Sequence, residues 1–209
     1  MSRIAILGAS CKLGDRIAGR ALELGFRVNA ISRTPEKLKR HAEMINVYRG
    51  DAASGVGLEA ALASCKNVVL AIASELPVIA QCAANVVRQL QNNTMLARLV
   101  FISCARHEQD PAPKKEGLFS RLLHPGQRTV HWDDLREAEG IVSLSGLNYV
   151  ILRTTPLTDG PSKHPLIAAP RHPTPPGKVS RHDLAHFVMD LVNQPSWADG
   201  ELLVGTRPP

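Results

Sequence analysis

Three residues near the start of the chain are spaced as in a turn that binds phosphate groups. Gly8, Cys11 and Gly14 occupy the three positions of G-x-x-G-x-x-G, between the apolar run "RIAIL" and a stretch with apolar residues at helical spacing. In such a turn the first glycine permits a tight bend, the second lets the backbone approach a pyrophosphate, and the third lets helix and strand pack closely. The helix N-terminus offers amide hydrogens to the phosphates. The pattern predicts a dinucleotide site, although a turn that merely joins strand to helix is the alternative. The residues expected to bind the dinucleotide here are Gly8, Ser10, Cys11, Lys12, Leu13 and Gly14.

The second glycine position of this turn holds a cysteine. At Cys11 a Cβ and a sulfur project toward the phosphate channel, unless the thiol turns aside and packs. We expect the cradle to be narrowed and the dinucleotide to bind less tightly than it would with glycine at this position. The alternative is an inert small residue that the turn tolerates.

The end of the second predicted strand distinguishes the two nicotinamide dinucleotides. A carboxylate there would hold the ribose hydroxyls of NAD, but "AISRTPEK" offers Ser32 and Arg33 and no acid before Glu36. An arginine suits a 2′-phosphate because its guanidinium binds oxyanions bidentately and stays charged. We therefore expect NADP, bound by Ser32 and Arg33, with a solvated surface arginine as the alternative. Asp51, after the third strand, is placed either to meet the adenine edge or to cap its own turn.

Apolar runs alternate with helical patterns along most of the chain. Strands are expected at residues 3–7, 26–32, 45–50, 67–73, 98–103 and 148–153, and helices at 13–24, 34–42, 57–65, 77–92, 129–145 and 181–193. Each parallel connection needs a crossover, so the alternation predicts a parallel sheet with helices on both faces. The fold class is α/β, a doubly wound Rossmann-type parallel sheet, in a single domain of residues 1–209.

Two segments interrupt this alternation. Residues 104–128 read as a long loop, and residues 155–178 are rich in proline. The second segment follows the sixth strand, so it lies at the carboxyl edge of the sheet, where ligands of open α/β sheets bind. We expect these segments to form a small proline-rich cap on the substrate side. Ser180 and Asp183 predict a capping box for the last helix.

Seven segments of the chain resemble, in order and spacing, the atypical short-chain dehydrogenase/reductases of the NAD(P)-binding, NmrA-like and biliverdin-IXβ/flavin reductase-like type. They are "RIAILGAS", "VNAISRTPEKL", "YRGDA", "VVLAIAS", "RLVFISCA", "SGLNYVILRTTPLTDG" and "VSRHDLAHFVMDLV". The resemblance implies a Rossmann core, NADP lying across the strand ends, and an isoalloxazine or tetrapyrrole stacked near the nicotinamide. The superfamily also contains sugar-nucleotide epimerases, quinone reductases and non-catalytic NADP sensors, so the resemblance is specific for the fold and weak for the substrate.

The resemblance also implies which residues border the nicotinamide. Ser103 and Cys104 end the fifth strand, where the relatives carry a pair of hydroxyls, and they are the expected catalytic residues. Ser103 is the stronger candidate for this role because a thiol forms weaker hydrogen bonds. The alternative is that the Ser103 hydroxyl only forms hydrogen bonds with buried backbone groups. The other cofactor-binding residues expected on this side are Ala71, Ile72, Ala73, Ser103, Thr154, Thr155 and Pro156.

The Tyr-x-x-x-Lys pair of the wider superfamily is absent from the sequence. The chain has two tyrosines, and the residue four positions beyond Tyr149 is Arg153. A phenol activated by an ammonium group is needed when hydride transfer to a carbonyl must be matched by a proton. A flavin or bilin delocalises the added charge until solvent protonates it. The absence of the pair therefore favours flavin-like acceptors over alcohols and ketones.

Composition limits the kinds of partner. The chain has a formal net charge of +6, but the basic residues are scattered and aromatics make up 4%, which disfavours nucleic acid. No apolar run is long enough to span a bilayer. Four dispersed cysteines predict reduced thiols, and His182 and His186 lack a third ligand, so we expect no metal. We expect a cytoplasmic protein that takes a small-molecule acceptor, with no membrane or nucleic-acid partner, and we allow for a homodimer.

These observations favour an NADPH-dependent reductase of a flavin-, bilin- or quinone-like conjugated acceptor. Such an enzyme would rely on the placement of the nicotinamide rather than on an acid–base residue. The alternative is a non-catalytic NADP(H)-binding sensor that acts on a protein partner. Nucleotide-sugar epimerisation ranks last because it needs the missing tyrosine and a larger C-terminal domain.

Overall fold

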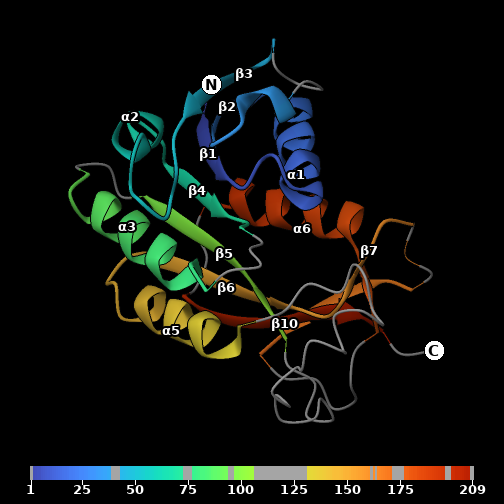
Figure 1. Cartoon of the computed structure of the whole chain (residues 1–209). Coiled ribbons are helices and arrows are strands. Elements are labelled where there is room, and N and C mark those ends of the chain that lie inside the picture. The colour runs from blue at the N-terminus through green and yellow to red at the C-terminus, as the bar shows by residue number, and fades with distance from the viewer. Residues whose placement is uncertain are drawn as a thin grey trace, which may run out of the picture.

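The computed structural model contains a large sheet flanked by helices (Figure 1). It describes residues 2–38, 43–72, 77–93, 97–105, 131–160, 162, 164–170, 177–195 and 199–207. The strands are β1 (Arg3–Leu7), β2 (Arg27–Ser32), β3 (Ile45–Arg49), β4 (Asn67–Leu70), β5 (Arg98–Cys104), β6 (Asn148–Thr154), β7 (Leu157–Thr158), β8 (Leu166–Ala169), β9 (Val179–Ser180) and β10 (Gly200–Thr206). The helices are α1 (Lys12–Glu23), the 3-10 helix η1 (Pro35–Leu38), α2 (Leu58–Leu62), α3 (Ile79–Gln91), α5 (Trp132–Ser143) and α6 (Arg181–Asn193).

The main sheet has the strand order β3-β2-β1-β4-β5-β6-β10-β8. Its neighbouring strands pair in parallel, except that β8 is antiparallel to β10. From β1 the chain winds outward to β2 and β3, and then crosses back to β4 on the other side of β1. The order therefore reverses between β1 and β4, and ligands of such sheets bind in the crevice beyond the carboxyl ends of these strands. The predicted doubly wound Rossmann-type fold is confirmed.

Helices cover both faces of this sheet. In Figure 1, α1 and α6 lie on one side of the strands, and α2, α3 and α5 lie on the other. Side chains alternate accordingly: Ile4 and Ile6 of β1 belong to the core under α1 and α6, whereas Ala5 and Leu7 belong to the core under α2, α3 and α5. All four are at most 1% exposed. Burial on both faces explains why the central strands are continuous apolar runs.

Several predicted elements differ in length from the observed ones. The helix expected at 34–42 is the 3-10 helix Pro35–Leu38, and residues 39–42 lie outside the described part of the chain. The helix expected at 57–65 is limited to Leu58–Leu62. Gly57, with φ +78°, precedes it, and Ala63 at its C-terminal end leaves the helical conformation, with φ −55° and ψ 132°. Short or irregular ends of this kind are set by tertiary contacts, which periodicity does not report.

The C-terminal part contains strands that the sequence reading did not include. β10 adds to the sheet beside β6, and β8 pairs with β10 as an antiparallel edge strand. β8 comes from the segment expected to form the cap, so this part of residues 155–178 extends the sheet. Most of residues 104–128 lie outside the described residues, and the cap stays a prediction.

Ser180 caps α6 as expected, because its Oγ accepts a hydrogen bond from the backbone N–H of His182 at 3.1 Å. The second half of the predicted capping box is different. The backbone N–H of Ser180 donates to Oγ of Ser162 at 3.3 Å, where a capping box would use Asp183.

Candidate cofactor and active site

The turn after β1 is built on two close backbone approaches at the point where the strand order reverses. Gly8 has φ +92°, and a Cβ added there would lie 2.3 Å from the carbonyl oxygen of Ala71, just beyond β4. A Cβ at Gly14 would lie 2.2 Å from the carbonyl oxygen of Gly8. Neither position can accept a side chain unless backbone moves. These are the roles expected for the first and third glycines of a dinucleotide cradle.

Cys11 is the N-cap of α1. Its φ of −86° is an ordinary value for a residue with a side chain, so the backbone here does not require glycine. Sγ accepts a hydrogen bond from the N–H of Gly14 at 3.3 Å and donates to the carbonyl of Ala71 at 3.4 Å. The thiol therefore turns aside toward the end of β4, which is one of the two arrangements considered from the sequence. It also engages one of the amide hydrogens that a helix N-terminus offers to phosphate.

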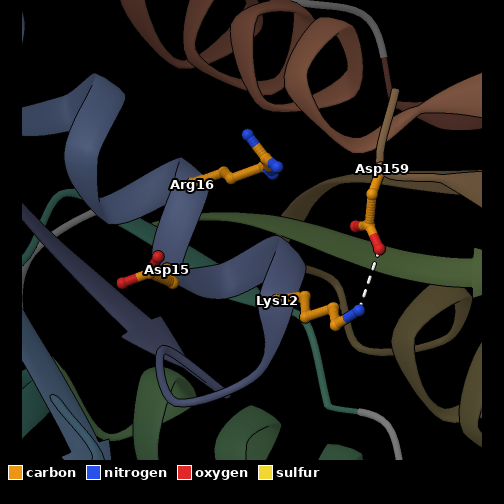
Figure 2. Close-up of a pocket in the computed structure, with 4 residues that line it drawn as sticks. All are labelled: Lys12, Asp15, Arg16 and Asp159. Atoms are coloured by element: carbon orange, nitrogen blue, oxygen red, sulfur yellow. Dashed lines mark hydrogen bonds and ion pairs between the residues drawn. The ribbon is translucent and has the colours of Figure 1, made fainter. Parts of the chain in front are cut away.

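The other residues of the turn have different environments. Ser10 is exposed, whereas Leu13 is 5% exposed and packs in the core under α1 and α6. The ammonium group of Lys12 reaches Oδ2 of Asp159 at 2.8 Å. Hydrogen bonding to Lys12, and then the charges of Arg181 and Lys12, lower the pKa of Asp159. Figure 2 shows this ion pair at a small open pocket of about 260 Å³, which is lined by Lys12, Asp15, Arg16 and Asp159.

The end of β2 presents a basic side chain. Ser32 is 5% exposed and is used by the protein itself, since its Oγ accepts from the N–H of Thr34 at 3.1 Å. Arg33 is exposed, and its guanidinium forms no ion pair with the residues that the structure describes. Glu36, the first acid after β2, is paired with Arg49 at 3.0 Å. The described residues therefore leave Arg33 available to an anion at the adenosine end of a dinucleotide.

Asp51 caps its own turn. Its Oδ1 accepts from the N–H of Ala53 at 3.0 Å. The side-chain amide of Asn85 in α3 donates to the carbonyls of Ala52 and Ala53, at 3.0 and 2.8 Å, and fixes the same turn from the helix side. This is the capping role considered from the sequence, and the proposed contact of Asp51 with adenine stays a prediction.

At the end of β4, the cradle is completed by Ala71, whose N–H donates to the carbonyl of Leu7 at 2.9 Å. Ala71 is 4% exposed and Ile72 is partly exposed. Ala73, the third residue expected here, lies outside the described residues.

Ser103 and Cys104 at the end of β5 point to opposite faces of the sheet. Ser103 is 2% exposed, and its hydroxyl donates to Oε1 of Glu139 in α5 at 2.5 Å. Cys104 is exposed as a residue. Partial burial of its sulfur and, to a lesser degree, the Glu139 carboxylate raise its pKa, which favours the neutral thiol. The two expected catalytic residues therefore have different surroundings, and Cys104 is the one open to solvent.

Glu139 belongs to a charged network that the sequence reading did not identify. Its carboxylate accepts from Nη2 of Arg153 at 2.7 Å and from Nε at 3.1 and 3.2 Å. Nη1 of Arg153 also reaches Glu201 of β10 at 2.7 Å. The hydrogen bond to Glu139 is the main cause that raises the pKa of Arg153. The sequence does show an arginine in an apolar strand and a glutamate on the apolar side of a predicted helix. No local pattern indicates that these two side chains pair.

The hydroxyls at the end of β6 are also used inside the protein. Oγ1 of Thr154 donates to the carbonyl of Ser103 at 3.1 Å, and Oγ1 of Thr155 donates to the carbonyl of Gly177 at 2.7 Å. Pro156 is exposed, and its carbonyl accepts from the N–H of Val179 at 3.2 Å. Thr154 lies beside the end of β5, because β5 and β6 pair as far as Cys104 and Thr154. The expected contact of Thr154, Thr155 and Pro156 with the nicotinamide stays a prediction.

The described ranges contain neither a metal-binding cluster nor a helix that could span a membrane. No group of three or more His, Cys, Asp or Glu side chains there could hold a metal ion. His182 and His186 contact each other, with ring centroids 4.4 Å apart. No helix in those ranges is long and apolar enough to cross a membrane.

Known proteins of the same fold share this architecture. ChuY from Escherichia coli O157:H7, described as an anaerobilin reductase, superposes with a TM-score of 0.77 at 19% identity over 100% of both chains. A short-chain dehydrogenase/reductase from Veillonella parvula, solved in complex with NADP, gives a TM-score of 0.76 at 18% identity over 98% of this chain and 94% of that one. A protein from Bacillus halodurans, described as a putative NAD-dependent epimerase/dehydratase, gives 0.76 at 17% identity over 99% and 95%.

No curated protein sequence matches this chain. A family model described as NAD(P)H-binding matches residues 8–195, which include the cradle, strands β2 to β6 and helix α6. Because this match covers most of the 209 residues, the chain belongs to the NAD(P)H-binding family.

Proposed function

We propose that this protein is an NADPH-dependent reductase that transfers hydride to a flavin-, bilin- or quinone-like conjugated acceptor. NADPH, when bound, supplies the hydride and becomes NADP⁺, and the acceptor gains the hydride and then a proton from solvent. The observation that carries the proposal is the arrangement of hydroxyls at the strand ends that flank the expected nicotinamide site. The bilin reductase activity named for the E. coli structure supports the same acceptor class.

The cradle fits a dinucleotide by geometry. The space that a Cβ would fill at Gly8 and Gly14 is occupied by backbone, so the turn lies close against β4 and the start of α1. Gly8, Ser10, Lys12 and Gly14 are expected to hold the pyrophosphate, with Lys12 supplying a positive charge. At the adenosine end, the exposed Arg33 supports NADP over NAD, since a guanidinium matches a 2′-phosphate and no carboxylate ends β2.

The hydroxyl groups at the ends of β5 and β6 are poorly suited to donate a proton. Each hydroxyl has one proton, and those of Ser103, Thr154 and Thr155 are directed to Glu139, to the carbonyl of Ser103 and to the carbonyl of Gly177. Tyr149 lies near the amino end of β6, whereas Thr154 is at the carboxyl end of the same strand. Within the described residues this arrangement favours an acceptor that needs no protein acid at the moment of hydride transfer.

The direct test is oxidation of NADPH, followed at its absorbance maximum, with FMN, a quinone and a bilin offered separately. We expect at least one of these acceptors to be reduced, and NADH to be a poorer donor than NADPH. Binding of NADPH without oxidation by any of the three would contradict the reductase and favour the non-catalytic NADP(H)-binding module.

A further inference from the structure

Asp159, which lies outside the predicted site, connects the segment after β7 to the first residues of α1 and α6. Oδ2 of Asp159 accepts from the ammonium group of Lys12 at 2.8 Å, and Oδ1 accepts from Nη1 of Arg181 at 2.9 Å. Lys12 is the first residue of α1, and Arg181 is the first residue of α6. A single carboxylate therefore links the first turns of two helices that are far apart in the sequence.

A small two-stranded sheet places Asp159 at this position. β7 pairs with β9 in parallel, with Thr158 opposite Ser180. Asp159 follows β7 and Arg181 follows β9, so the two residues are next in the same register. The contact between Asp159 and Arg181 is thus set by backbone pairing. The contact with Lys12 is held by two exposed side chains, which are 74% and 48% exposed.

The charges around Asp159 bear on an anionic ligand. Lys12 belongs to the turn that is expected to receive the pyrophosphate, and Arg16 lies one helical turn further along α1. Figure 2 shows Arg16 and Lys12 on the side of α1 that faces Asp159, whereas Asp15 points away. Arg16 forms no ion pair with any residue in the described part of the chain. A phosphate arriving here would meet the Lys12 ammonium already neutralised by a carboxylate, and that carboxylate would repel it.

We propose that Asp159 competes with the pyrophosphate of the dinucleotide for Lys12, and thereby sets the affinity of the cofactor site. In the structure Lys12 is paired with Asp159. When the pyrophosphate enters the cradle, Lys12 leaves Asp159 for the phosphates, and Asp159 stays paired with Arg181. An exposed ion pair is weak, so two phosphate charges at a helix N-terminus can displace it. This inference rests on the proposed cofactor site, and it does not depend on the acceptor.

The test is a titration of NADPH, by its fluorescence or by calorimetry, with Asp159→Asn. We expect the variant to bind NADPH about two- to fivefold more tightly at low salt, as expected for the loss of one exposed competing ion pair, and the gain to shrink at high salt. Glu23→Gln is the matched control, because Glu23 is an exposed carboxylate paired with Arg20 at 2.9 Å near the other end of α1. This control should leave the dissociation constant unchanged.

The same titration in a Lys12→Met background distinguishes competition for Lys12 from direct electrostatic repulsion between Asp159 and the phosphates. If Asp159 acts through Lys12, adding Asp159→Asn to Lys12→Met should change the affinity much less than it does in the wild type. Unchanged or weaker binding by Asp159→Asn would contradict the proposal, and so would an equal gain in both backgrounds. Reduction of FMN, a quinone and a bilin by the same proteins is measured separately. If none of the three is reduced while the binding pattern is intact, the proposed reductase is contradicted and the role of Asp159 stands.

Discussion

The two ends of the predicted cofactor site are built in different ways. The cradle after β1 is a backbone structure, in which the carbonyls of Gly8 and Ala71 lie where side chains cannot fit. The ends of β5 and β6 are organised by side chains, with Ser103, Glu139, Arg153 and Glu201 joined from four elements. A backbone site tolerates few substitutions at its glycines, whereas a side-chain network can be altered one partner at a time. The two regions should therefore respond differently to mutation.

The largest effect is expected in the cradle. Gly8→Ala places a Cβ about 2.3 Å from a backbone oxygen at a positive φ, so we expect a loss of about 2–4 kcal/mol in the free energy of unfolding. NADPH binding should be lost with it. The control is Gly25→Ala, where φ is +78° but no atom lies within 4 Å of the added Cβ. There we expect only the conformational cost, about 1 kcal/mol. Equal losses in urea unfolding of the two variants would show that the contact with Ala71 is unimportant.

The next effect concerns the choice of cofactor. If Arg33 binds the 2′-phosphate, Arg33→Ala should weaken the binding of NADPH by about 1.5–3 kcal/mol and leave the binding of NADH almost unchanged. The reason is that a charge-assisted contact is lost only with the phosphorylated cofactor. The matched control is Arg49→Ala, which removes an exposed arginine of the neighbouring strand β3 that is paired with Glu36 of η1. Equal weakening of NADPH and NADH by Arg33→Ala, measured by titration, would rule out this role.

In the side-chain network, Glu139→Gln should lower the free energy of unfolding more than Glu201→Gln does. The Glu139 side chain is 10% exposed and binds both Ser103 and Arg153, whereas the Glu201 side chain is 40% exposed and, among the described residues, pairs with Arg153 alone. We expect a loss of about 1–2.5 kcal/mol for Glu139→Gln and at most about 1 kcal/mol for Glu201→Gln. Thermal and urea unfolding measure both. A reversed order would mean that the outer ion pair, between Arg153 and Glu201, stabilises the fold more than the inner one.

The smallest effect is expected at Cys11. Cys11→Gly removes the sulfur that engages the N–H of Gly14 and frees this amide for a phosphate. We expect NADPH to bind a few-fold more tightly, consistent with about 0.5–1 kcal/mol for one neutral hydrogen bond. NADP should also protect Cys11 from iodoacetamide. If affinity and labelling both stay the same, the sulfur does not influence the phosphate site.

The sequence was informative where function depends on local spacing. The cradle, the strand–helix alternation and the basic end of β2 each lie within a few neighbouring residues, so their geometry follows from the order of residue types. β10 and the network around Glu139 depend on segments that meet only after folding, since Glu139 is 14 positions from Arg153 and 36 positions from Ser103. Asp159 was missed for the same reason: its partner Lys12 is 147 positions away. Local periodicity carries no signal for such contacts.

The pH dependence of hydride transfer from NADPH to FMN, measured in single turnovers on the wild type and on Tyr149→Phe, tests whether the protein supplies a proton. If the protein places the nicotinamide and supplies no proton donor, the rate should stay nearly flat between about pH 6 and 9, and Tyr149→Phe should match the wild type. A steep limb that belongs to a protein group would contradict this claim. So would a collapse of the rate in Tyr149→Phe while the variant remains folded.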